Sequence, residues 1–420
     1  MREQQPPRTK QNIVRFPSSR RERKRLLREN KDPRVRITVL LRAVCGWLLV
    51  VCTFLFLLSN YRLLSPASIR SVVEYAIAGL RQHEGDITSI YYENGTFADA
   101  ALFEAGLAYV DNDSLFLARP GSMTTMRQTL GYSNPVVETC DDYVLVYDRG
   151  GMNAVLTNAA APVAELALDS AIITGSLGQD GRFVLVTDEP GYRTAVAVYD
   201  TTGKEVFKYR SSEYYILSAC LSPDEKTLAV LAFQQDGVAL TTHVQFYDVS
   251  SGSLDADVSL EDTLGMTLCY PENGTAVVLC DDGLYMIGRG GEANQVLTAA
   301  STDMIAFATQ GDVLALATRS YTSGARSDVY TVRGGTLSGP YPLAEEPSAL
   351  AVSAYGTAAL SSSGVTVYDK NFTPLWHNTE AIGARRVLLT DDGTLCVLYT
   401  KNARLFTARS EHSEEVTDVN

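Results

Sequence analysis

Histidine is scarce in this sequence, and the motifs of enzymes that depend on it are missing. Only four histidines occur in 420 residues. The sequence has no His-Glu-x-x-His zinc motif, no Gly-x-Ser-x-Gly nucleophile turn and no Gly-x-x-x-x-Gly-Lys phosphate loop. We therefore predict no catalytic, cofactor-binding or metal-ligating residue. We interpret the four histidines as ordinary structural side chains: His83, His243, His377 and His412.

Acidic turns and cysteines indicate no metal site and no disulfide framework. Asp111-Asn-Asp-Ser114 resembles the start of a calcium loop, but the glycine and the later acidic ligand of such a loop are missing. We interpret it as a plain turn. Seven cysteines are present, two of them in an apolar run near the N-terminus, which leaves an odd five. Whether any pair, such as Cys269 and Cys280, forms a bridge stays open.

Lysine and arginine crowd the N-terminus, and an apolar run follows them. Residues 1–36 contain 13 Lys and Arg, whereas residues 43–58 contain no charged side chain. A helix of about 20 apolar residues spans a bilayer, and tails rich in Lys and Arg stay in the cytoplasm. We therefore predict a single transmembrane helix over residues 37–61 in the cell membrane. The N-terminus is expected to be cytoplasmic, and the C-terminal domain extracellular.

The basic tail is longer than that of a secretory signal, and no Ala-x-Ala-like cleavage site follows the apolar run. We therefore predict an uncleaved signal anchor. Residues 1–36 have few apolar side chains and are expected to be disordered. Their charge favours contact with anionic lipid at the inner leaflet.

The chain beyond the tail is acidic. Residues 1–42 contain 14 Lys and Arg against 4 Asp and Glu, so the remainder contains 22 against 45. This excess of acidic residues argues against nucleic-acid binding. It leaves three alternatives open: cationic partners, bound cations, or a charge that only keeps the domain soluble.

A helix is predicted directly after the apolar run. Ser65 is placed to cap its first turn and Pro66 to occupy its first position, and the helix is expected to end near residue 84. Its apolar residues recur at helical spacing and give one apolar face for packing: Ile69, Val72, Val73, Ala76, Ile77 and Leu80.

From residue 86 onward, short apolar runs alternate with polar turns, and one element recurs. A strand leads into a tight turn with Gly or Asp, and a second apolar strand follows, as in Ser222-Pro-Asp-Glu-Lys-Thr-Leu-Ala-Val230. The spacing of these turns matches the length of one four-stranded propeller blade, about 40 residues. The eight turns are centred on residues 106, 142, 181, 224, 274, 311, 356 and 393.

A second recurring element lies between these turns. It is a strand ending in Tyr-Asp or a Gly pair, then a turn and another strand, as in Ala195–Val206, and it indicates the third and fourth strands of a blade. We predict an all-β fold with an eight-bladed propeller over residues 86–410 and a disordered tail over 411–420. The last repeat has only three obvious strands, so Asp86–Tyr92 is expected to supply the fourth. Seven blades is the alternative, because the first two repeats are the least regular.

These turns resemble those of the WD40/YVTN/quinoprotein-like propeller superfamily. The layout of basic tail, one span and propeller also resembles a bacterial family known only as a domain of unknown function. The first resemblance implies a propeller scaffold and leaves activity open. In quinoprotein repeats a Trp recurs in the blades, whereas Trp376 is the one Trp beyond the apolar run. The resemblance therefore implies a non-catalytic relative and no cofactor.

We predict a membrane-anchored extracytoplasmic module that binds or scaffolds a protein or a cell-envelope glycan. Propellers present loops around a central channel, and the 22 tyrosines suit interfaces and sugar stacking as well as packing between blades. The alternative is an extracytoplasmic enzyme, a hydrolase, lyase or quinoprotein-like protein, acting in the channel. Such an enzyme would be recognised by a cluster of carboxylates with His or Arg in the central channel. A sensor signalling through the tail is a third option.

Overall fold

The structure is a computed structural model. It describes residues 44–52 and 89–407, apart from residues 105, 121, 122, 141, 238, 273, 322, 323 and 325. The basic tail, the helix over 65–84 and the C-terminal tail lie outside the described residues. Of the predicted span, residues 44–52 are described, and they are helical. Within the described parts of the chain, no helix is long and apolar enough to cross a membrane.

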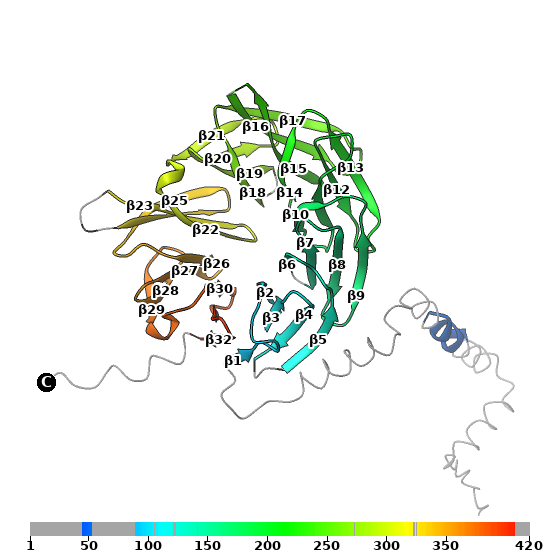
Figure 1. Cartoon of the computed structure of the whole chain (residues 1–420), viewed down its shortest axis with the longest axis horizontal. Helices are drawn as coiled ribbons and strands as arrows, with labels where there is room; N and C mark the ends of the chain where they lie inside the picture. The colour runs from blue at the N-terminus through cyan, green and yellow to red at the C-terminus, as the bar shows by residue number, and fades with distance from the viewer. Residues whose placement is uncertain are drawn as a thin grey trace, which may run out of the picture. The chain divides into compact units, whose positions relative to one another are not determined.

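Eight antiparallel four-stranded sheets form a ring of blades within the unit Ala67–Asn420 (Figure 1). In the first seven blades the four strands follow one another along the chain, the first lying nearest to the centre of the ring. The strands are β2 (Asp99–Phe103), β3 (Gly106–Val110), β4 (Ser114–Arg119) and β5 (Met123–Thr129) in blade 1; β6 (Pro135–Cys140), β7 (Tyr143–Asp148), β8 (Asn153–Asn158) and β9 (Pro162–Ala167) in blade 2; β10 (Ile172–Leu177), β11 (Phe183–Thr187), β12 (Thr194–Tyr199) and β13 (Glu205–Ser211) in blade 3; and β14 (Tyr215–Leu221), β15 (Thr227–Asp236), β16 (Ala239–Asp248) and β17 (Leu254–Glu261) in blade 4.

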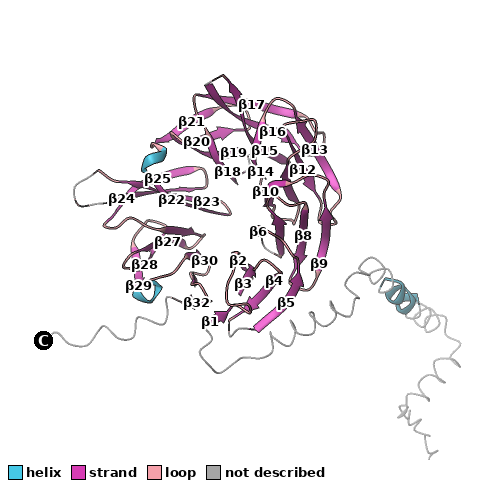
Figure 2. Cartoon of the chain, in the orientation of Figure 1, coloured by secondary structure: helices cyan, strands magenta, loops and turns pink. Residues whose placement is uncertain are grey.

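The ring continues through three further blades of the same kind. Their strands are β18 (Gly265–Glu272), β19 (Thr275–Cys280), β20 (Gly283–Gly288) and β21 (Ala293–Thr298) in blade 5; β22 (Met304–Gln310), β23 (Val313–Arg319), β24 (Ser327–Arg333) and β25 (Thr336–Leu343) in blade 6; and β26 (Ala349–Val352), β27 (Gly356–Ser361), β28 (Gly364–Asp369) and β29 (Pro374–Asn378) in blade 7. Two short 3-10 helices, η2 (Ser301–Asp303) and η3 (Thr379–Ala381), lie between blades, where Figure 2 shows them among strands.

Blade 8 joins the two ends of the propeller. Its first three strands are β30 (Arg386–Leu389), β31 (Leu395–Leu398) and β32 (Asn402–Phe406), and its fourth is β1 (Ser89–Tyr91), which pairs antiparallel with β32. The prediction that the segment before the first full blade completes the last one is therefore confirmed. The count of eight blades is also confirmed.

The core consists of eight apolar clusters, one at each junction between neighbouring blades. A blade cannot bury its two faces alone, so each face packs on the next blade around the ring. The second strands are therefore covered on both sides. In β3 all five residues are buried, and the polar–apolar alternation of a half-exposed strand is lost.

The predicted turns all fall between the first and second strands of their blades. The turn at 181, for example, joins β10 to β11, and the turn at 356 joins β26 to β27. Because strands within a blade are antiparallel, these turns and those between third and fourth strands open on one face of the ring, which we call the bottom face. Connections between second and third strands, and between blades, open on the opposite top face.

Candidate functional site

Blade 4 differs from the others at the top face. Its second and third strands, β15 and β16, have ten residues each and pair from Thr227 with Asp248 as far as Asp236 with Ala239. The equivalent strands of blade 3 have five and six residues. The extra length forms a hairpin that continues past the ends of the neighbouring strands. The predicted turns at residues 224 and 274 enclose this hairpin and are 50 residues apart, against about 40 for one blade. That longer interval was the signal for the hairpin in the sequence.

Aromatic and arginine side chains gather beside this hairpin. The rings of Tyr215 and Phe233 stack with centroids 5.2 Å apart, and the guanidinium carbon of Arg193 lies 4.6 Å from the centre of the Tyr215 ring. Tyr192, the residue before Arg193, is 47% exposed, and Tyr215 is 40% exposed. Tyr192 and Arg193 come from the connection between β11 and β12 of blade 3, and Tyr215 and Phe233 come from blade 4. We call these four residues the blade 4 surface. A stacked arginine and accessible tyrosines are the side chains that most often dominate protein interfaces.

Hydrogen bonds hold this surface in place. The Arg193 backbone N–H donates to the carbonyl of Ser211 (2.8 Å), and its side-chain Nε donates to the carbonyl of Ser212 (3.2 Å). Gln234 on the hairpin donates to the carboxylate of Glu213 (3.2 Å). The hairpin is therefore fixed to the connection between blades 3 and 4, and the surface is formed before any partner arrives.

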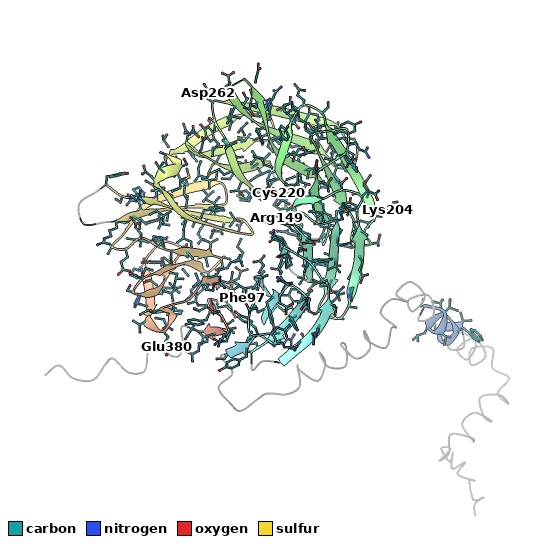
Figure 3. All side chains as sticks on the ribbon, viewed as in Figure 1. Phe97, Arg149, Lys204, Cys220, Asp262 and Glu380 are labelled. Carbon is teal, nitrogen blue, oxygen red and sulfur yellow. The ribbon has the colours of Figure 1, made fainter. Side chains whose placement is uncertain are left out.

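Exposed carboxylates lie at the top-face end of blade 4, where this surface also lies. Glu213 lies in the connection that leads into Tyr215, and Asp236 lies at the end of the hairpin. Glu261 pairs with the start of β16, and Asp262, labelled in Figure 3, follows it. Arg193 is a cation within the surface itself, and Arg210, beside Tyr192, is paired with Glu189 (2.7 Å). The local charge is thus negative, in keeping with the acidic composition of the chain beyond its N-terminal tail.

Charged side chains from the first strands of three blades meet on the inner side of the ring. Asp99, at the start of β2, accepts hydrogen bonds from Arg386 of β30 (2.7 Å), from the backbone N–H of Val137 in β6 (2.9 Å) and from its neighbour Ala100 (2.9 Å). One carboxylate thus bonds to blades 8, 1 and 2. Both carboxylate oxygens of Asp99 already accept hydrogen bonds, so we interpret Asp99 as a residue that stabilises the closed ring.

Glu138 lies on β6 beside this group. Burial and the charge of Asp99 raise the pKa of Glu138 from its usual value of 4.5 to about 7, against the opposing effect of Arg386 and Arg149. Arg149 projects toward the centre of the ring in Figure 3. None of these residues was predicted as a site residue from the sequence. The available signal was a charge within otherwise apolar inner strands, since Arg386 begins Arg-Val-Leu-Leu and Glu138 follows Pro-Val-Val.

We expect Glu138 to make the stability of the propeller depend on pH. The folded protein keeps the Glu138 proton up to about pH 7, whereas the unfolded chain releases it near pH 4.5. The free energy of unfolding contributed by this group therefore falls as pH rises through that window. Glu138→Gln, neutral at every pH, should be more stable than wild type at pH 8 and equal to it near pH 4.5. Urea unfolding at both pH values measures these free energies. A difference between the two proteins that does not change with pH would contradict the prediction.

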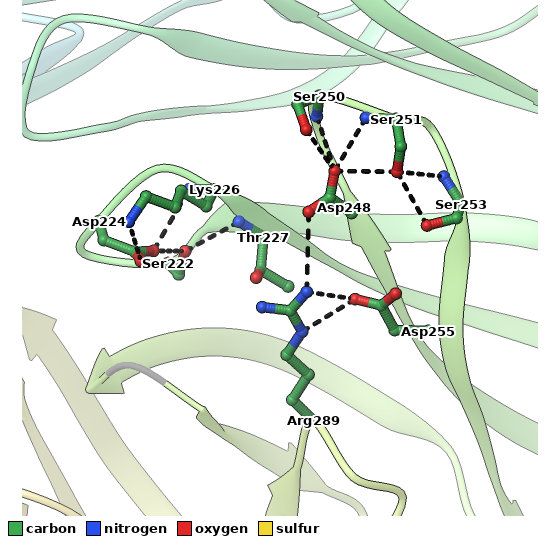
Figure 4. Close-up of polar contacts among 10 residues, drawn as sticks. All are labelled: Ser222, Asp224, Lys226, Thr227, Asp248, Ser250, Ser251, Ser253, Asp255 and Arg289. Carbon is green, nitrogen blue, oxygen red and sulfur yellow. Dashed lines mark hydrogen bonds and ion pairs between the residues drawn. The ribbon is translucent and has the colours of Figure 1, made fainter.

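A further polar cluster lies on the bottom face between blades 4 and 5 (Figure 4). Arg289 donates through Nε to Asp255 (2.8 Å), and its Nη2 lies 3.8 Å from Asp248. Asp248 also accepts from the hydroxyls of Ser250 (2.7 Å) and Ser251 (2.9 Å), which lower its pKa to about 2. These groups satisfy one another across the blade junction, so we interpret the cluster as structural.

The described histidines occupy ordinary positions. His243 bonds to Asp257 (2.9 Å) within blade 4, and His377 bonds to Thr366 (2.9 Å) within blade 7. His83 and His412 lie outside the described residues. Among the residues that the structure describes, no group of His, Cys, Asp and Glu is placed to hold a metal ion.

Cys269 and Cys280 carry separate thiols and form no disulfide bridge with each other. Burial raises the pKa of both thiols to about 12. Burial likewise raises the pKa of the Cys396 thiol, on the second strand of blade 8, to about 12. Thiols with such pKa values are not nucleophilic at neutral pH. They pack as small apolar side chains.

Comparisons with solved structures identify propellers. Sqt1 of Saccharomyces cerevisiae aligns with a TM-score of 0.51 at 10% identity and covers 78% of this chain and 99% of its own. The C-terminal WD40 domain of Sif2 aligns with a TM-score of 0.52 at 14% identity and covers 76% of this chain and 97% of its own. At these identities the likeness concerns the fold alone. A search of curated proteins found no match.

A family model also matches the sequence. That match extends over residues 86–337, from the closing segment into blade 6. The chain belongs to the family of unknown function DUF5711.

Proposed function

We propose that this propeller is a binding module, anchored in the membrane by residues 37–61 and exposed outside the cell, which docks a basic protein on its blade 4 surface. The observation that carries the proposal is the stack of Arg193, Tyr215 and Phe233 beside a hairpin that projects from the top face. Side chains of this kind bind proteins through desolvated contacts with ring faces. The basic residues of the N-terminal tail support its orientation in the membrane.

The charge around the stack supports a basic partner. Glu213, Asp236, Glu261 and Asp262 are exposed on the same part of blade 4. Opposite charges steer association and exclude acidic competitors. A partner of matching charge, held at the cell surface by the anchored propeller, would be scaffolded there.

The test uses the full-length chain in intact cells and a cross-linker that cannot cross membranes. Wild type should capture at least one discrete basic protein, and Tyr215→Ala combined with Phe233→Ala should reduce the capture about tenfold or more, as expected for hot-spot residues. Tyr321→Ala is the matched control, because Tyr321 is an 81% exposed tyrosine on blade 6. Capture only after cell lysis would refute the extracellular location. Equal capture by all variants would refute docking at this surface.

A channel enzyme is the second candidate, and Glu138 is the observation that favours it. A carboxyl group with a pKa of about 7 beside Asp99 and Arg386 has the protonation state that general acid–base catalysis uses. Turnover of a small molecule that Glu138→Gln abolishes, while Tyr215→Ala leaves it unchanged, would support the enzyme over the docking module.

A further inference from the structure

A cavity of about 450 Å³ opens beside the seam at which the ring closes. One wall is the connection from β1 to β2 and includes Asn94 and Phe97. The opposite wall is the turn from β3 to β4, residues 111–113, and Arg127 of β5 completes it. We call this cavity the seam pocket. Its volume is within the range of small-molecule sites, about 300–1,000 Å³.

The carboxylate of Asp111 fastens the two walls together. Asp111 is 6% exposed, and its Oδ1 accepts from the backbone N–H groups of Asp113 (2.8 Å) and Ser114 (2.6 Å). Its Oδ2 accepts from the side-chain amide of Asn94, across the pocket. The turn is therefore rigid, and its shape depends on the closing connection. A ligand that fits both walls binds the closed ring in preference to the open one.

The other polar side chains of the pocket include an acidic acceptor, Asp113, and a basic donor, Arg127. Asp113 and Asn112 are exposed, and no hydrogen bond from the described residues occupies the Asp113 carboxylate. Arg127 is held by Glu93, 3.6 Å away, and by the face of Phe116, 5.3 Å away. The pocket thus offers acceptors on one wall and the Arg127 guanidinium beside them.

An aromatic ring supplies the apolar part of the pocket. Phe97 packs against Tyr92 with ring centroids 5.0 Å apart, and the guanidinium of Arg385 lies 6.0 Å from its centre. The ring therefore has a fixed orientation within the lining. Amide, carboxylate and guanidinium groups around one aromatic ring match a sugar, which has hydroxyl groups along its edge and C–H groups on its face.

The charges exclude other small ligands. A divalent cation prefers several free carboxylate oxygens, but both Asp111 oxygens already accept hydrogen bonds, and Arg127 adds a positive charge. An anion would face Asp111 and Asp113. A neutral molecule with many hydroxyls meets neither obstacle. We infer that the seam pocket binds a neutral sugar residue of a glycan, a function separate from protein docking on blade 4.

The test titrates the full-length chain, purified in a detergent without a sugar headgroup, with four neutral probes: maltotetraose, cellotetraose, mannotetraose and chitotetraose. At least one should bind saturably and raise the melting temperature, because the ligand joins both sides of the seam. Asp113→Ala should weaken that binding about tenfold, the loss of one charged hydrogen bond. Phe97→Leu, which keeps an apolar side chain, should also weaken it.

Asp169→Ala is the matched control, because Asp169 is an exposed carboxylate in the connection between blades 2 and 3. It should leave sugar binding unchanged. Failure of all four probes at about 10 mM, where even weak sites fill, would overturn the inference. Equal binding by wild type, Asp113→Ala and Phe97→Leu would overturn it too, as would displacement of the sugar by CaCl₂. Protein capture depends on blade 4, so it would be unaffected by either result.

Discussion

Replacing Ile90 with aspartate is expected to open the ring. Ile90 is the middle residue of β1, pairs with Ala403 of β32 and is fully buried in the cluster between blades 8 and 1. An aspartate there would place an unpaired carboxylate among apolar side chains, including Leu107 and Phe116. Burial of an unpaired charge lowers the free energy of unfolding by about 4 kcal/mol or more, or else expels the strand. Urea unfolding and amide hydrogen exchange in β32 measure the two effects.

Tyr91→Asp provides the matched control. Tyr91 is the next residue of the same strand and is 64% exposed, so the carboxylate of an aspartate there would stay hydrated. This variant should lower the free energy of unfolding by less than about 1 kcal/mol. Equal losses at residues 90 and 91 would mean that strand propensity, and not the buried contact with blade 1, determines closure.

Gly356→Ala is expected to disrupt blade 7 from within. Gly356 begins β27, and a Cβ added there would overlap the carbonyl oxygen of Tyr368 on β28. Its own carbonyl accepts a hydrogen bond from Arg333 of blade 6 (2.9 Å), so the backbone cannot move away without losing a contact between blades. We expect the free energy of unfolding to fall by about 3 kcal/mol, the usual cost of overpacking plus a lost bond. Thermal and urea unfolding provide the measurement.

Gly274→Ala separates this clash from the ordinary cost of removing a glycine. Gly274 has φ +94°, and an added Cβ would have open space around it. Alanine there should cost about 1 kcal/mol, through backbone strain alone. A loss at residue 356 no greater than at residue 274 would show that the strands of blade 7 adjust without penalty.

The blades could be predicted from the sequence because each turn and strand pattern lies within a short stretch of the chain. A turn such as Ser222-Pro-Asp-Glu-Lys and the alternating strands on each side of it depend on residues near one another in the chain. The closing strand was predicted from a count, since the last repeat lacked one strand. The sites depend on which blades become neighbours. Asp99 and Arg386 are 287 residues apart and meet only because blade 8 returns to blade 1.

Two interpretations of individual residues change once the fold is known. Asp111-Asn-Asp-Ser114 is the turn that was expected, but it also forms one wall of the seam pocket, since Asn94 is brought against it by the closure. Glu138, beside Asp99 and Arg386, was not selected from the sequence. Its strand gives no hint of its partners, which come from blades 1 and 8. The chemistry of both places arises from long-range contacts that repeat spacing does not encode.

The seam also determines how the propeller would respond to mechanical load. The chain enters at Ser89 and leaves after Phe406, and both residues belong to blade 8. Tension applied through the preceding residues reaches β1 first, a strand of three residues joined to β32. The other seven blades lie outside this direct line of force. Under tension the propeller should yield first by release of β1, which would separate the two walls of the seam pocket and release its ligand.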